Sequence, residues 1–221
     1  LQPFVLGPDD RGPGLSEEYR LFPSEGGGHG RAFPMESMDP LLPPNFRVRP
    51  AVPEDLTGMA RVHVETWKTT YREMVPDDRL DALTVEGDIA GGFGRWLRSP
   101  PEDVAQFVAE RGPEGIVGFA LGGPNREPDP AFLGELGAIY VRKSQQGRGV
   151  GRALVGAVAR HLVRIERPST IVWVLAQNPY RRFYERLGGI HVRERIGQSR
   201  LAGAVPEVSY GWTDVRGLAR L

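Results

Sequence analysis

Residues 140–155 read YVRKSQQGRGVGRALV and join a predicted strand to a predicted helix through a glycine-rich turn. Within the turn, QGRGVG (residues 146–151), three glycines alternate with larger residues. Glycine lets backbone N–H groups approach a ligand closely, and the first turn of a helix has unpaired N–H donors at its positive end. Arg148 and Arg152 add positive charge. The pattern predicts an anion cradle, for which a pyrophosphate is a natural ligand.

Two nucleotide-binding motifs fit this turn poorly. A P-loop requires GxxxxGK[ST], and no Lys-Ser or Lys-Thr follows these glycines. A dinucleotide fold requires GxGxxG early in a βαβ unit, whereas here the spacing is GxGxG and four predicted strands come first. A helix start that needs small residues only for packing stays open as an alternative.

The hydrophobic pattern on both sides of the turn predicts one α/β domain over residues 46–221. The predicted strands are 46–52, 104–110, 115–122, 132–141, 170–176, 190–196 and 205–212. The predicted helices are 53–73, 150–165 and 179–187, together with a helical stretch at 77–98 that is broken near Gly91-Gly92. The helix at 150–165 connects two strands and predicts a parallel crossover. We therefore expect a mixed, mostly antiparallel sheet of six to seven strands flanked by about four helices.

Residues 1–45 have a different composition. They hold 7 Gly and 8 Pro, with 7 acidic against 3 basic residues, and show no sustained period. Such a composition is typical of a flexible extension. We expect residues 1–34, which precede Met35, to contribute little to the folded domain.

The overall composition excludes several classes of function. The chain has no Cys, which excludes disulfides, Cys-zinc sites and thiol nucleophiles. Its 28 basic and 28 acidic residues balance, which disfavours a nucleic-acid-binding role. It has no apolar run of the ~20 residues that a membrane helix requires, and no signal-peptide pattern at its start. We expect a cytoplasmic protein with no membrane or nucleic-acid partner.

The glycine-rich turn resembles the acyl-CoA-binding signature Q/R-x-x-G-x-G/A of the GNAT superfamily of N-acetyltransferases. Gln146, Gly149 and Gly151 match this pattern. The likeness extends from about residue 46 to 215 and includes the order of elements, the stretch FYERLGG at 183–189 and EVSYGW near the end. The resemblance implies a GNAT-like fold and acetyl-CoA as co-substrate.

The resemblance also implies which residues hold the cofactor. The strand before the turn would splay from its neighbour and pair its backbone with the pantetheine arm, and the turn would hold the pyrophosphate. An Asn that the family often has seven residues before a Tyr is replaced by a Gln, with an Asn one position later. The implied cofactor-binding residues are Ile139, Tyr140, Val141, Gln146, Gly147, Arg148, Gly149, Val150, Gly151, Arg152 and either Gln177 or Asn178.

For catalysis, the resemblance points to Tyr184 and Glu135. A phenol near the sulfur can protonate, or hydrogen-bond to, the departing thiolate. The alternative is a tyrosine that only packs under the cofactor. Glu135 is a candidate general base for the amine, although a solvent-facing carboxylate at a strand end is an equal alternative.

Trp67 and Tyr71, one helical turn apart, are candidates for the acceptor pocket or for the core. His63 fits a core or pocket-wall position better than a ligand position. The remaining histidines have no ligand-like spacing, so we predict no metal site.

Two functions remain at this stage. The first is an N-acetyltransferase in which the amine of an acceptor attacks acetyl-CoA directly in a ternary complex, since the chain has no Cys for an acyl-enzyme. The second is a non-catalytic acyl-CoA-binding or regulatory module. The acceptor would be a small-molecule amine or an amine of a peptide or protein, and a homodimer stays open.

Overall fold

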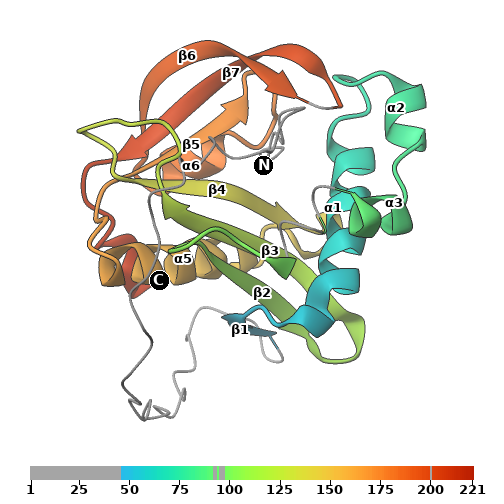
Figure 1. Cartoon of the computed structure of the whole chain (residues 1–221), viewed down its shortest axis with the longest axis horizontal. Coiled ribbons are helices and arrows are strands. Elements are labelled where there is room, and N and C mark those ends of the chain that lie inside the picture. The colour runs from blue at the N-terminus through green and yellow to red at the C-terminus, as the bar shows by residue number, and fades with distance from the viewer. Residues whose placement is uncertain (1–45, 92–93, 95–97, 200) are drawn as a thin grey trace, which may run out of the picture.

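Seven strands form a single sheet in the order β1-β2-β3-β4-β5-β7-β6 (Figure 1). The computed structural model describes residues 46–91, 94, 98–199 and 201–221, so the predicted extension at 1–45 lies outside the described residues. The strands are β1 (Phe46–Pro50), β2 (Ala105–Arg111), β3 (Gly115–Pro124), β4 (Gly134–Val141), β5 (Thr170–Leu175), β6 (Ile190–Ser199) and β7 (Gly203–Trp212). The described α-helices are α1 (Leu56–Thr70), α2 (Asp77–Asp81), α3 (Val85–Ala90), α5 (Val150–Arg164) and α6 (Arg182–Arg186).

This architecture confirms the predicted fold class. Each pair of neighbouring strands is antiparallel except β4 and β5, which α5 connects as a parallel crossover. The break expected near Gly91 is confirmed, since α3 ends at Ala90 with Gly91 as its C-cap. The stretch is also broken earlier, because residues 82–84 separate α2 from α3 and the Thr84 hydroxyl accepts a hydrogen bond from the Gly87 N–H. Residues 92–93 and 95–97 of that expectation lie outside the described residues. No described helix is long and apolar enough to cross a bilayer.

Strands β4 and β5 separate soon after they begin. Only Gly134 pairs with Thr170 and Glu135 with Ile171, whereas β5 pairs with β7 along its whole length. A register shift between β3 and β4 makes Gly137 an extra residue, between Leu136 and Ala138. Bulges of this kind bend a strand, so the second half of β4 diverges from β5. The sheet therefore has an opening toward the carboxyl ends of both strands.

The two faces of the sheet are covered by different helices. On one face, the Cα of Gly122 lies close against Val158 of α5, and that of Gly134 lies close against Leu162. On the other face, the Tyr140 ring meets the His63 ring of α1 edge-on at 5.0 Å between centroids. Side chains alternate along a strand, but the bulge at Gly137 interrupts this alternation in β4, so the residues before and after it are assigned to the α5 face or the α1 face separately.

Candidate active site

A cavity of about 510 Å³ lies on the α5 face, beside the opening between β4 and β5. It runs from the second half of β4 over the glycine-rich turn to α6. It is lined by Ile139, Val141, Gln146, Gly147, Gly149, Gly151, Arg152, Tyr180, Phe183, Arg186 and Leu187. We call it the turn cavity. Seven of its lining residues belong to the predicted cofactor-binding set.

The backbone of the turn requires glycine at two positions. Gly147 has a φ of 71° and Gly149 a φ of 83°, in the left-handed region that other residues adopt only under strain. Gly149 is also the N-cap of α5, and no side chain among the described residues caps this helix end. The first N–H groups of a 15-residue helix are therefore available to a ligand beside the turn cavity.

The remaining residues of the predicted turn have distinct positions. The Gln146 side chain donates from Nε2 to the Val141 carbonyl at 3.1 Å and so closes the turn on itself. Val150 has its side chain in the core, so only its backbone faces the helix start. Arg148 and Arg152 are exposed, and Arg152 lines the turn cavity.

Gln145 is a residue of this turn that the sequence analysis missed. Its side chain is buried, accepts from Arg111 at 2.9 Å and donates to Glu114 at 2.8 Å. These contacts fasten the turn to the β2–β3 hairpin. Gln145 and Gln146 are adjacent in the sequence, which gives no signal that the Gln145 side chain is the one that binds to the hairpin.

A second, smaller cavity of about 220 Å³ lies on the opposite face of β4. Gly123 pairs with Glu135, and both lie on the face away from α5, since the adjacent Gly122 is directed at Val158. The lining residues are Pro101, Glu102, Val104, Leu121, Gly122, Gly123, Pro124, Asn125, Arg126, Glu135 and Gly137. We call it the acid cavity because Glu102 and Glu135 line it. Strand β4 thus separates two cavities near the point where it leaves β5.

Glu135 is almost fully buried in the wall of the acid cavity. Arg126 holds its carboxylate through both guanidinium branches, with Nε to Oε2 at 2.8 Å and Nη2 to Oε1. The alternative of a solvent-facing carboxylate is therefore wrong. The sequence offered no signal for Arg126, which comes from the loop between β3 and β4.

Tyr184 is buried and does not line the turn cavity, but its ring contacts that of Phe183, which does. Its ring stacks on Tyr210 at 5.8 Å between centroids and meets the edges of Phe183 and Trp212. Burial raises the pKa of the Tyr184 hydroxyl, so the phenol stays protonated at neutral pH.

Tyr184 belongs to a group of buried polar side chains at the opening. Burial raises the pKa of Tyr71, and the nearby Tyr140 and Tyr184 raise it further. Asn178 is buried and donates from Nδ2 to the Tyr71 hydroxyl at 3.0 Å, while Gln177 is exposed. Of the two alternatives from the sequence, Asn178 therefore occupies the interior position.

Trp67 and Tyr71 are fully buried, with ring centroids 4.6 Å apart, and the described structure places them in the core. His63 is also buried and accepts from Trp67 Nε1 at 2.8 Å. Its Nδ1 lies 2.5 Å from an oxygen of Asp88, a partner that the sequence did not reveal. Within the described ranges, no group of three His, Asp or Glu side chains is arranged to hold a metal ion.

The chain is 36% identical over 177 residues to the uncharacterised N-acetyltransferase YuaI of Bacillus subtilis (strain 168), covering 79% of this chain and 96% of YuaI. It belongs to the GNAT superfamily of N-acetyltransferases. Residues 129–196 of this GNAT protein also match the family described as FR47-like protein. These residues contain the glycine-rich turn and the 183–189 stretch, two of the features on which the resemblance is based.

Solved structures show the same GNAT fold. The structure of yncA from Salmonella typhimurium with acetyl-CoA has a TM-score of 0.56 at 17% identity, over 76% of this chain and 93% of that one. The PaiA N-acetyltransferase from Thermoplasma acidophilum, in complex with coenzyme A, has a TM-score of 0.55 at 15% identity, over 76% and 99%. The relatives favour an acyltransferase over the non-catalytic module.

Proposed function

We propose that this protein transfers the acetyl group of acetyl-CoA to the amine of a small acceptor, by direct attack in a ternary complex. The observation that carries the proposal is the pair of cavities on opposite faces of β4, the acid cavity at Glu135 and Gly137 and the turn cavity from Ile139 onward. Two substrates held on opposite faces of one strand can react, where β4 leaves β5, without a covalent enzyme intermediate.

Acetyl-CoA is the co-substrate, and the turn cavity is its site. The pyrophosphate lies over Gly147, Gly149 and the free N–H groups at the start of α5, where the helix dipole favours negative charge. The pantetheine arm follows Ile139 to Val141, whose backbone β5 leaves unpaired. The acetyl-CoA and CoA complexes of two proteins with the same fold support this assignment.

The acceptor occupies the acid cavity. Its volume of about 220 Å³ suits a small amine or the terminus of a longer one. Arg126 pairs with Glu135, so the carboxylate of Glu102 is the charge in the lining that favours a cationic group. Glu135 takes the proton that the attacking nitrogen loses, directly or through water. Arg126 already binds the Glu135 carboxylate and holds it in one position. The position of this carboxylate in turn determines where the amine can bind.

Tyr184 acts on the departing sulfur. The C–S bond of the thioester breaks as the C–N bond forms, and the thiolate needs a hydrogen bond and then a proton. The raised pKa of Tyr184 keeps its proton available as a donor, and solvent restores that proton after the free thiol leaves.

The test is a panel of amines assayed with acetyl-CoA by the release of free thiol. Small primary amines should give thiol release in proportion to the acetylated product, whereas tertiary amines of the same size should give none. If the protein binds CoA and no amine of any size releases thiol above the rate in buffer, the proposed function is wrong.

A further inference from the structure

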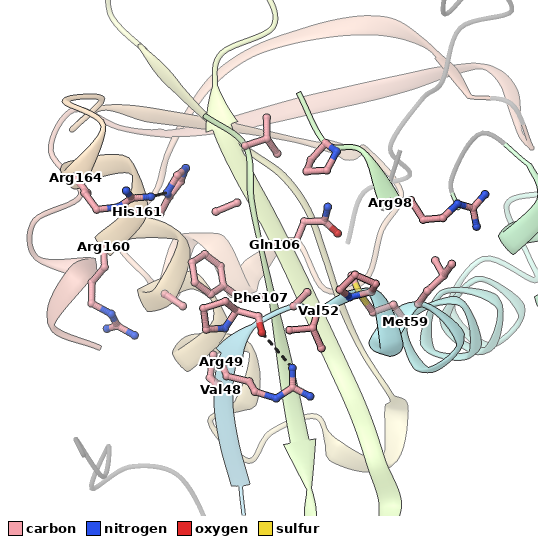
Figure 2. A pocket seen from close by; sticks show the side chains of 18 residues that line it. Val48, Arg49, Val52, Met59, Arg98, Gln106, Phe107, Arg160, His161 and Arg164 are labelled. Carbon is pink, nitrogen blue, oxygen red and sulfur yellow. Dashed lines mark hydrogen bonds between the residues drawn. The ribbon is translucent and has the colours of Figure 1, made fainter. Parts of the chain in front are cut away.

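A third cavity, of about 660 Å³, lies at the β1 edge of the sheet, away from the glycine-rich turn (Figure 2). It is bounded by the end of β1, the start of α1, the start of β2 and the second half of α5. We call it the edge cavity. None of its lining residues is shared with the turn cavity. Its volume is in the range of small-molecule sites, roughly 300–1,000 Å³.

The edge cavity is open because β1 is short. The pairing of β1 with β2 ends at Pro50 and Phe107, and the Ala51 N–H makes a last bond to Gln106. Pro50 and Pro53 lie on either side of the point where β1 ends. Neither has a backbone N–H that could continue the hydrogen bonding with β2. The start of β2 therefore has no neighbouring strand on this side among the described residues. Residues of α1 and α5 line the space that this leaves.

The charged side chains in the described lining of the edge cavity are basic. Among the described residues, the lining contains Arg49, Arg98, Arg160, Arg164 and His161, but no Asp or Glu. Arg49 is neutralised by Asp55 and Glu110, which do not line the cavity.

Three of the lining guanidinium groups form no ion pair with an acid among the described residues. Within the described part of the chain, Arg98 donates to the Ile89 carbonyl, Arg160 to the Ala219 carbonyl and Arg164 to His161. None of these acceptors carries a negative charge, so an anion in the cavity would meet uncompensated cations.

His161 orients one of these cations. Its Nε2 lies 2.6 Å from the Asp103 carbonyl, which only accepts, so Nε2 carries the proton. Its Nδ1 then accepts from Arg164 at 2.8 Å. In this arrangement the imidazole holds the Arg164 guanidinium beside the cavity. Figure 2 shows Arg164 reaching His161, with Phe107 between this pair and Val52.

The walls next to these cations are apolar. The Phe107 ring meets the His161 ring at 6.5 Å between centroids, and Val48, Pro50 and Ala157 line the same region. A ligand that matches this surface has a negative head for Arg164 and Arg160 and an apolar body for Phe107.

We propose that the edge cavity is a second ligand site, for a small molecule that carries one carboxylate or phosphate group on an apolar body. The head binds at Arg164 and Arg160, and the body packs on Phe107 in the space that the short β1 leaves. The site is separate from the transfer reaction, since it shares no residue with the turn cavity and only Val104 with the acid cavity.

The test uses three eight-carbon probes, octanoate, octyl phosphate and octan-1-ol, titrated calorimetrically into the full chain with saturating CoA in the turn cavity. One equivalent of octanoate or octyl phosphate should bind at least ~10-fold more tightly than octan-1-ol, and added salt should weaken only the anions. The stronger of the two anions identifies the preferred head group.

Variants assign the binding to these residues. Arg164→Gln and Arg160→Gln should each weaken the binding of the anion by ~10-fold and leave octan-1-ol unchanged, and Arg164→Lys should retain part of the affinity. Arg61→Gln, an exposed residue of α1 outside the cavity lining, is the matched control and should change nothing. An unchanged CoA-induced thermal shift shows that each variant is folded.

Four results would overturn the proposal. The first is an equal affinity for octan-1-ol and for the two anions. The second is anion binding that neither Arg164→Gln nor Arg160→Gln weakens. The third is the absence of any binding heat from all three probes. The fourth is binding only to a chain that starts at Met35, because the acidic extension would then be the natural occupant.

Discussion

Gly149 is the residue on which the cofactor site depends most directly. Its φ of 83° places the N-cap of α5 so that the following N–H groups point outward. A β-branched residue cannot adopt this φ without strain, so Gly149→Val should abolish the thermal stabilisation by CoA. Gly217→Val is the control, since Gly217 has a φ of −63° and open space around its Cα. A normal CoA shift in Gly149→Val would rule out the turn as the pyrophosphate site.

Tyr184→Phe tests the proton donor to the sulfur. The variant keeps the ring stacked on Tyr210 and removes only the hydroxyl, so turnover should fall by ~10- to 1000-fold with CoA affinity nearly unchanged. Because burial raises the pKa of Tyr184, the wild-type rate should show no loss from phenol ionisation below about pH 10.

Tyr210→Phe is the matched control for Tyr184→Phe. It removes a neighbouring hydroxyl that donates to Glu185 at 2.9 Å, and it should keep turnover within ~3-fold. Full turnover in Tyr184→Phe on a confirmed acceptor would mean that water protonates the thiolate.

Glu135→Gln tests the proton acceptor. Its turnover should fall by ~10- to 100-fold at neutral pH, and less as the pH rises toward about 10, where the free amine of the acceptor accumulates. Glu102→Gln changes an exposed carboxylate of the same cavity and should mainly raise the KM for the amine. A loss in Glu135→Gln that is the same at every pH would assign Glu135 a structural role through Arg126.

At the scale of single elements, β4 is the strand that faces both cavities. Gly137 lies at its bulge and lines the acid cavity, and a Cβ there would come 2.7 Å from Leu121 Cδ1. Gly137→Ala should therefore narrow the acid cavity and raise the KM for the acceptor by ~10-fold, with the Kd for CoA unchanged. A parallel loss of CoA affinity would show that the bulge, rather than the cavity, was disturbed.

The elements that the sequence predicted well are those with strong local patterns. The 150–165 helix has a continuous apolar face, and it appears as α5 within one residue. The glycine-rich turn was found because its φ angles require glycine locally. Residues 77–90 form two short helices, α2 and α3, instead of one continuous helix. Helix α6 is shorter than expected, with turns on both sides.

At the scale of the whole molecule, the sequence could not reveal contacts between distant segments. Gln145 is anchored by Arg111, and His63 meets Asp88 from α3. The loop between β3 and β4 is tied to β6 by two ion pairs, Glu127 with Arg195 and Asp129 with Arg193. Each partner is an ordinary charged or polar residue in its own segment, so only the folded chain shows which ones meet.

The separation of β4 from β5 has a consequence for how the protein opens. The sheet consists of a four-stranded part (β1 to β4) and a three-stranded part (β5 to β7) that share only two residue pairs. Two parts of a sheet that share so few hydrogen-bonded pairs tend to unfold as separate cooperative units. The surface ion pairs between them contribute little free energy to holding them together. Native-state hydrogen exchange should therefore give different opening free energies for amides of β3 and β7 in the free protein. A pantetheine arm bound between the two parts would act as an eighth strand, and with CoA present the two values should converge.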